Sequence, residues 1–80
     1  MIAIQVRLFA RAREIAGADV IAVALPEGAT VGDLRRRLAE EHPRLSELVK
    51  RSALAVEQEF AEDDQPVRGE VALLPPVSGG

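Results

Sequence analysis

Apolar side chains recur at every second position near the start of the sequence, at Ile2, Ile4, Val6 and Leu8. A period of two puts successive side chains on opposite faces of an extended backbone, so residues 2–9 are predicted to form a strand with one aliphatic face. The alternation returns at Ile21, Val23 and Leu25, which predicts a second strand over residues 19–25. Between the strands, residues 10–16 have a helical composition and precede Gly17, a residue suited to a left-handed helix cap.

The main helix is predicted to begin at Thr30 and to end at His42. Thr30 and Asp33 have capping-box spacing; because aspartate is shorter than glutamate, Asp33 either closes the box or only favours the helix dipole. One apolar stripe follows at helical spacing, formed by Val31, Leu34 and Leu38. Pro43 ends the helix, since the residue before a proline avoids the α region. His42 is therefore interpreted as a helix-terminal residue and not as a catalyst.

The second half of the chain is predicted to contain short elements. A helical turn around residues 45–49 precedes a third strand over 52–57, which has Leu54 and Val56 inward. An acidic turn follows at 62–66. The chain is then predicted to have a short strand at Val67, a turn at Arg68-Gly69 and a last strand over 71–74. The acidic turn lacks the glycine and downstream glutamate of a calcium loop, so a solvated turn is expected. Helices gathered on one face of a mixed sheet make an α+β roll, in a single domain over residues 1–80.

Composition narrows the chemistry that the chain can perform. With no cysteine and one histidine in 80 residues, thiolate and multi-histidine metal sites are excluded, and no metal is expected. A net charge of −3 and two aromatic residues argue against nucleic-acid binding, and the run at residues 35–37 is interpreted as a solvated helix face. The amino end has no long apolar run. Neither a signal peptide nor a membrane span is predicted, and a cytoplasmic location is expected.

The end of the sequence, residues 75–80, is predicted to be a protruding functional tail. It consists of Pro75, Pro76, Val77, Ser78, Gly79 and Gly80. Proline fixes φ and stiffens the base of the tail, whereas the two glycines can thread a channel too narrow for a Cβ atom. The alternative is that this end is only a frayed terminus.

Two apolar residues break the alternation of the strands that carry them. Phe9 is out of step with Leu8, and Leu74 is out of step with Leu73, so both are predicted to point away from the helix-covered face. If Phe60 joins them, an apolar patch lies on the open face of the sheet near the base of the tail. Exposed apolar clusters often mark partner surfaces. The alternative is that Phe9 or Phe60 packs locally under a loop.

Three segments of the sequence carry a resemblance to a known family. Residues 8–14 read LFARARE, residues 25–34 read LPEGATVGDL and residues 71–80 read VALLPPVSGG. Together they resemble the MoaD-like family, the small subunits of molybdopterin synthase, and the final segment is the most specific of the three. The resemblance implies a ubiquitin-like β-grasp fold. Two departures are Glu57, where the family usually has asparagine before Gln58, and a shorter approach to the last strand at residues 68–70.

The resemblance also implies a covalent function for the tail. An ATP-dependent, E1-like activating enzyme would adenylate the carboxylate of Gly80, and a persulfide sulfur donor would convert it to a thiocarboxylate. Gly80 would then carry the sulfur into the large synthase subunit and donate it to cyclic pyranopterin monophosphate, giving the molybdopterin dithiolene. Catalytic groups would belong to the partners, and this chain would bind no cofactor, with ATP used by the activating enzyme.

The site residues implied by the resemblance fall into two groups. Gly79, Ser78 and Val77 would thread the partner's channel behind Gly80. Five residues would dock the large subunit, which are Phe9, Phe60, Leu74, Pro75 and Pro76. A heterotetramer of two small and two large subunits is the implied assembly.

Two rival functions stay open at the level of the sequence. One is a related β-grasp carrier that delivers sulfur for thiamine thiazole or tRNA thiolation, or acts as a protein modifier. The other is an interaction module with an inert Gly-Gly end. Sulfur incorporation at the carboxyl end separates the second from the first, and the acceptor molecule separates the carriers from one another.

Overall fold

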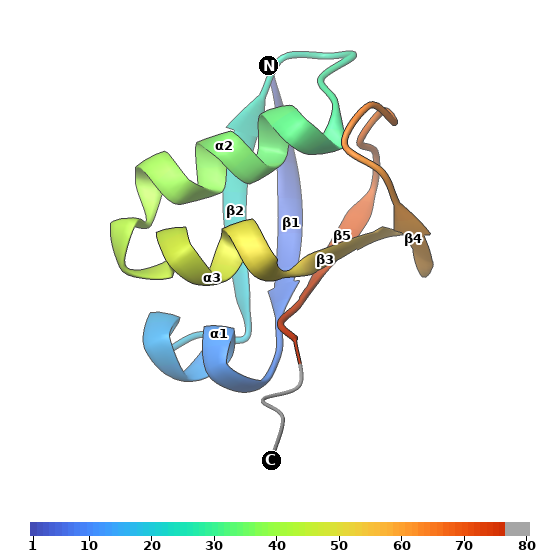
Figure 1. Cartoon of the computed structure of the whole chain (residues 1–80). Coiled ribbons are helices and arrows are strands. Elements are labelled where there is room, and N and C mark those ends of the chain that lie inside the picture. Colours follow the sequence, from blue (N-terminus) through green and yellow to red (C-terminus); the bar gives the residue numbers. More distant parts are fainter. Residues whose placement is uncertain (77–80) are drawn as a thin grey trace.

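One mixed sheet organises the fold, and a computed structural model describes it over residues 1–76 (Figure 1). The five strands in this range are β1 (Ile2–Leu8), β2 (Val20–Leu25), β3 (Ala53–Val56), β4 (Glu59–Ala61) and β5 (Glu70–Leu74). Their order across the sheet is β2–β1–β5–β3–β4, with β1 and β5 parallel at the centre and the other neighbouring pairs antiparallel. The expected α+β roll is confirmed. The tail positions Val77, Ser78, Gly79 and Gly80 lie outside the described residues.

Helical segments connect the strands and cover one face of the sheet (Figure 1). They are α1 (Ala10–Ala16), α2 (Val31–Glu41), the 3-10 turn η1 (Pro43–Leu45) and α3 (Ser46–Arg51). Gly17 closes α1 with a left-handed φ of 69°, as predicted. His42 ends α2 by donating its backbone N–H to the Leu38 carbonyl at 2.9 Å, so its helix-terminal position is also confirmed. Along residues 1–76, no helix is both long enough and apolar enough to cross a membrane.

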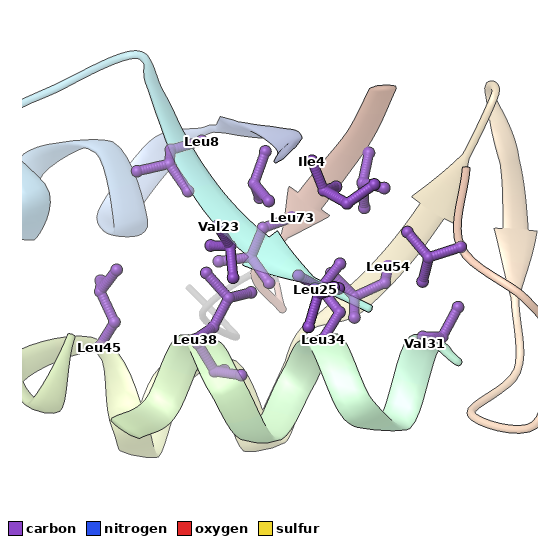
Figure 2. Packing of buried hydrophobic residues seen from close by; sticks show 14 of the residues in the cluster. Ile4, Leu8, Val23, Leu25, Val31, Leu34, Leu38, Leu45, Leu54 and Leu73 are labelled. Atoms are coloured by element: carbon purple, nitrogen blue, oxygen red, sulfur yellow. The ribbon is translucent and has the colours of Figure 1, made fainter. Parts of the chain in front are cut away.

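The hydrophobic core lies between α2 and the sheet (Figure 2). The predicted stripe of α2, formed by Val31, Leu34 and Leu38, is completely buried. It meets the inward residues of the central strands, which are Ile4, Val6 and Leu8 from β1 and Val71 and Leu73 from β5. Burying an aliphatic side chain contributes about 1.5–3 kcal/mol, so this contiguous cluster is the main source of stability. The two-residue and helical periods in the sequence therefore predicted the core correctly.

The start of α2 is a complete capping box. Asp33 Oδ2 accepts a hydrogen bond from the Thr30 backbone N–H at 2.9 Å, and Thr30 Oγ1 accepts one from the Asp33 backbone N–H at 3.2 Å. Two backbone donors without intrahelical partners are thereby satisfied. The shorter aspartate side chain closes the box, which settles the choice that the sequence left open.

Acid is expected to weaken this capping box. The pKa of Asp33 is held below its usual value mainly by the backbone hydrogen bond from Thr30, then by the Thr30 side chain and the charge of Arg36. Such a carboxylate stabilises the fold fully above its unfolded pKa of about 3.9, and that contribution is lost as the pH falls through the lower folded value. Urea midpoints of the natural chain should fall more steeply below about pH 5 than those of Asp33→Asn. Parallel pH profiles would contradict this assignment.

Arg35 is not the solvated helix residue that the sequence predicted. Its Nη1 atom donates to the Val49 carbonyl at 2.6 Å and to the Ser52 carbonyl at 2.8 Å, which satisfies the carbonyl end of α3. Its Nε atom donates to Asp63 at 3.2 Å. The acidic turn is therefore tied to α2, whose Gly32 N–H also donates to the Asp63 carbonyl. The sequence offered no signal for these contacts because each joins residues far apart in the chain.

Arg35→Met is expected to destabilise the fold by about 2 kcal/mol, since charge-assisted hydrogen bonds contribute roughly 1.5–3 kcal/mol and the aliphatic stem is kept. Arg36→Met serves as the control, because the Arg36 guanidinium is well exposed and, among residues 1–76, pairs only with Asp33 on the surface. Thermal unfolding should show a loss of roughly 8–16 °C for the first variant and little change for the second. Equal melting temperatures would show that Arg35 is dispensable.

The prediction of a strand at Val67 is wrong. The structure instead contains a strand that was not predicted, β4. Glu57 and Gln58 have φ values of 51° and 70°, and they turn the chain directly from β3 into β4. Two-residue hairpin turns with both φ values positive favour Asn-Gly, so Glu-Gln gave no turn signal. Phe60 is consequently part of a strand. Val67 is buried outside the sheet, with its N–H donating to the Ala29 carbonyl at 3.0 Å.

Gln58→Gly is expected to stabilise the domain by about 1 kcal/mol, because a left-handed conformation costs a non-glycine residue roughly 1–2 kcal/mol. Gln5→Gly is the matched control. Gln5 lies inside β1, where glycine should destabilise the strand. Denaturant midpoints should therefore shift in opposite directions for the two variants, and a decrease for both would argue against strain at the turn.

Candidate partner-binding surface

The face of the sheet opposite α2 carries Phe9, Phe60 and Leu74, here called the open-face patch. Phe9 has an extended backbone, with φ −130° and ψ 157°, so it continues the alternation of β1 beyond Leu8. Since Leu8 pairs with Leu73 in the parallel β1–β5 ladder, Phe9 and Leu74 occupy the next position on the open face. Phe9 is 42% exposed and Leu74 is half-buried. Both residues lie where the sequence phase predicted them.

Phe60 belongs to the same face and is the most exposed residue of the patch. Its cross-strand partner in β3 is Ala55, and Ala55 in turn pairs with Ala72 in β5. Paired residues project from the same side of a sheet, so these three side chains form one row. Phe60 is 76% exposed, which excludes the alternative that it packs under a loop. Aromatic side chains this exposed are typical of partner surfaces.

Phe9 also breaks a local rule of helix formation. It is the N-cap residue of α1 and makes no side-chain capping hydrogen bond. Serine, threonine, aspartate and asparagine are preferred at this position because their oxygens accept a backbone hydrogen bond. A phenylalanine that is exposed and contributes nothing as a cap is explained more readily by binding than by folding.

The base of the tail adjoins the open-face patch. β5 ends at Leu74, at the end of the sheet where β1 leads into α1 (Figure 1). Pro75 is half-buried and Pro76 is exposed. The proposed threading residues Val77, Ser78 and Gly79, and the proposed reactive residue Gly80, lie beyond the described part of the chain, so their roles stay predictions.

The polar groups around the patch are paired with one another. Arg7 lies 3.9 Å from Glu70, and Arg68 lies 3.2 Å from Glu57. Within residues 1–76, no group of three or more histidine, cysteine, aspartate or glutamate residues is arranged to hold a metal ion. The described surface therefore has the character of a docking face, with charged residues at its rim.

Sequence reasoning missed Ala55 and Ala72, which lie between the members of the patch. The signal was present, because both alternate with inward residues of their strands. What the sequence could not supply was the pairing of β5 with β3 and of β3 with β4, which brings the alanines between Phe9 and Phe60.

Comparisons with known proteins agree over nearly the whole chain. The model of the ThiS family matches residues 6–80. The chain is 38% identical to a Dictyostelium discoideum protein named molybdopterin synthase sulfur carrier subunit, over 95% of this chain and 94% of that protein. The structure resembles that of SAMP1, small archaeal modifier protein 1, from Haloferax volcanii. That likeness has a TM-score of 0.83 and 33% identity, and covers 98% of this chain and 99% of the other.

A third likeness concerns the fold alone. It is to a Helicobacter pylori structure described as the protein–protein complex of subunits 1 and 2 of molybdopterin-converting factor. The TM-score is 0.67 at 23% identity, with 99% of this chain and 100% of that chain covered. These neighbours confirm the ubiquitin-like β-grasp arrangement that the sequence resemblance implied.

Proposed function

The chain belongs to the ThiS family, and on that premise we propose that it is the sulfur carrier subunit of a molybdopterin synthase. The observation that carries the proposal is the match to the Dictyostelium discoideum sulfur carrier subunit, which extends over nearly the full length of both proteins. The open-face patch beside the tail base supports it, because a carrier must dock before it delivers its cargo. The name of that relative makes it one subunit of a larger enzyme, so the proposed partner is the large synthase subunit.

The proposed chemistry takes place at the carboxylate of Gly80. A carboxylate resists nucleophilic attack because its charge is delocalised. In the proposed adenylation by an ATP-dependent, E1-like enzyme, a carboxylate oxygen bonds to the α-phosphorus of ATP and pyrophosphate leaves, so that AMP becomes a good leaving group on the carbonyl carbon. The terminal sulfur of a persulfide then displaces AMP, and a thiol cleaves the resulting S–S bond. The products are a thiocarboxylate on Gly80 and a disulfide on the donor side.

The residues of this chain would hold and deliver that sulfur. Phe9, Phe60 and Leu74 would dock the large subunit, and Pro75 and Pro76 would direct the tail toward it, because proline restricts the backbone at the exit from β5. Acid–base groups and the pterin pocket would lie on the large subunit. The proposed assembly is a heterotetramer of two small and two large subunits in the cytoplasm.

A second candidate function is protein modification or another thiolation pathway. The observation that favours it is the likeness to SAMP1, whose TM-score of 0.83 is higher than the 0.67 of the Helicobacter pylori complex. Activation of Gly80 would be the same in both cases, and only the acceptor would differ. The acceptor is therefore the property to measure.

The deciding experiment has two steps. The chain is first incubated with its activating enzyme, ATP and a persulfide donor, and its intact mass is measured. We expect the exchange of one oxygen for sulfur at the carboxyl end; an unchanged mass would contradict every carrier function. The thiocarboxylated chain is then mixed with the large subunit and cyclic pyranopterin monophosphate. Formation of the dithiolene product supports the synthase, whereas its absence, with sulfur reaching another acceptor, supports the second candidate.

A further inference from the structure

A hollow of about 410 Å³ opens on the same face of the sheet as the open-face patch and is bordered by Phe9. Ala55 and Ala72 form its floor and Phe9 forms one wall, while Gln58 and Glu70 lie at its rim. Ala72 lies between Arg7 of β1 and Ala55 of β3, and Phe60 follows on β4. Phe60 therefore stands three strands from Arg7, or about 14 Å at the usual strand spacing, with the two alanines between them. Phe9 lies two residues beyond Arg7 along the same chain direction.

The floor of this hollow is apolar, and the charged residues at its edge form ion pairs. Glu70 pairs with Arg7, and Glu57 pairs with Arg68. Small-molecule sites of similar volume, roughly 300–1,000 Å³, have polar groups that converge on the ligand. Here the ion pairs are half-exposed at the edge and the floor consists of methyl groups. An apolar side chain of a protein is the occupant that this surface complements.

The alanines also keep the hollow open. Strands favour β-branched and aromatic residues, and alanine is depleted in them. β3 and β5 follow that preference on their core face, where Leu54, Val71 and Leu73 are buried. On the opposite face the same two strands carry alanine, although a larger side chain would fill the hollow and add strand propensity. Folding therefore does not require the small residues at these positions.

The position of the tail identifies the protein that supplies the occupant. Ala72 precedes Leu74 by two residues on the same face, and Gly80 follows Leu74 by six residues. Six residues span at most about 20 Å. Whatever protein receives the carboxylate of Gly80 must approach the end of β5 at Leu74. Leu74 is level with Phe9, which forms one wall of the hollow, so that protein is placed to cover the hollow as well.

We propose that the hollow over Ala55 and Ala72 receives one bulky apolar side chain of the large synthase subunit, which makes the two alanines specificity-determining residues for docking. This inference rests on the proposed function. It adds a size requirement to the open-face patch: Phe9, Phe60 and Leu74 supply contact area, and the alanines decide which side chain fits between them.

The test compares added bulk inside and outside the hollow. Ala72→Leu should weaken binding to the large subunit roughly 10- to 100-fold, the range expected for overpacking a complementary contact. Ala72→Ser adds almost no volume and should bind far more tightly than Ala72→Leu. Ala22→Leu is the matched control, because Ala22 is exposed on the same face of β2, opposite Gln5 and outside the hollow. Affinities are measured by calorimetry, and folding by thermal unfolding.

Thiocarboxylate formation at Gly80 is measured in parallel for every variant. If the natural chain acquires sulfur and binds the large subunit, but Ala72→Leu binds equally well, the hollow proposal is overturned and the carrier function stands. If the natural chain acquires no sulfur, the carrier function itself fails. If Ala72→Leu changes only self-association, as seen by sedimentation, the occupant is a second copy of this chain and the proposal is overturned.

Discussion

Gly80→Ala is expected to fold like the natural chain and to lose sulfur transfer by roughly 100-fold or more. A displacement of reacting atoms by about 1 Å can cost on the order of 10²-fold in rate. A Cβ atom at the terminal residue would meet the wall of the channel that we propose in the large subunit, and would limit the angle of attack on the terminal carbonyl. Because residues 75–80 follow the last strand, the core is untouched and the unfolding midpoint should not change.

Single-turnover transfer from the preformed thiocarboxylate to the pterin substrate is the measurement that isolates this effect. Ser78→Ala is the matched control, since it changes a side chain in the same tail without adding a Cβ atom. Near-natural rates for Gly80→Ala would disprove the threading argument. A loss in both variants would assign the effect to the tail as a whole and not to the terminal glycine.

The fold could be predicted from the sequence wherever apolar residues recurred at one regular spacing along a whole helix or strand. β1, β2 and α2 each present one unbroken apolar face to a single core, so their alternation or helical spacing was sufficient. β4 was missed because three residues are too few to show a period, and because Glu57 and Gln58 are not typical turn residues. Val67 was misread as a strand because burial and strand pairing give the same local signal.

The candidate site was predictable in part for the same reason. Phe9 and Leu74 were found because each departs from the phase of its own strand, which is local information. The contacts of Arg35 and the row of Ala55 with Ala72 depend on which elements become neighbours, and this is decided by the whole fold. The alternation of the alanines with inward residues was also easy to overlook, because small side chains are only weakly hydrophobic, although their size is what shapes the surface.

The open-face patch also separates binding from folding in a single variant. Phe9→Asp should weaken docking to the large subunit by at least roughly 30-fold, the loss expected for a hot-spot residue that contributes about 2 kcal/mol. The same change places a favoured capping residue at the start of α1, where Phe9 makes no capping bond. The unfolding midpoint should therefore stay the same or rise while affinity falls. Leu74→Asp should weaken docking in the same direction.

Val20→Asp is the matched control for this prediction, because Val20 is 40% exposed and Phe9 is 42% exposed. Val20 lies on the same face of the sheet but on β2, opposite Arg7 and two strands from β5, which carries the tail. An equal loss of affinity in both variants would mean that added negative charge, and not the patch, disturbs docking. Unchanged affinity for Phe9→Asp would remove Phe9 from the interface. Since the change improves the helix cap, a loss of binding with full stability, together with unchanged binding of Val20→Asp, assigns the effect to the lost contact at the surface.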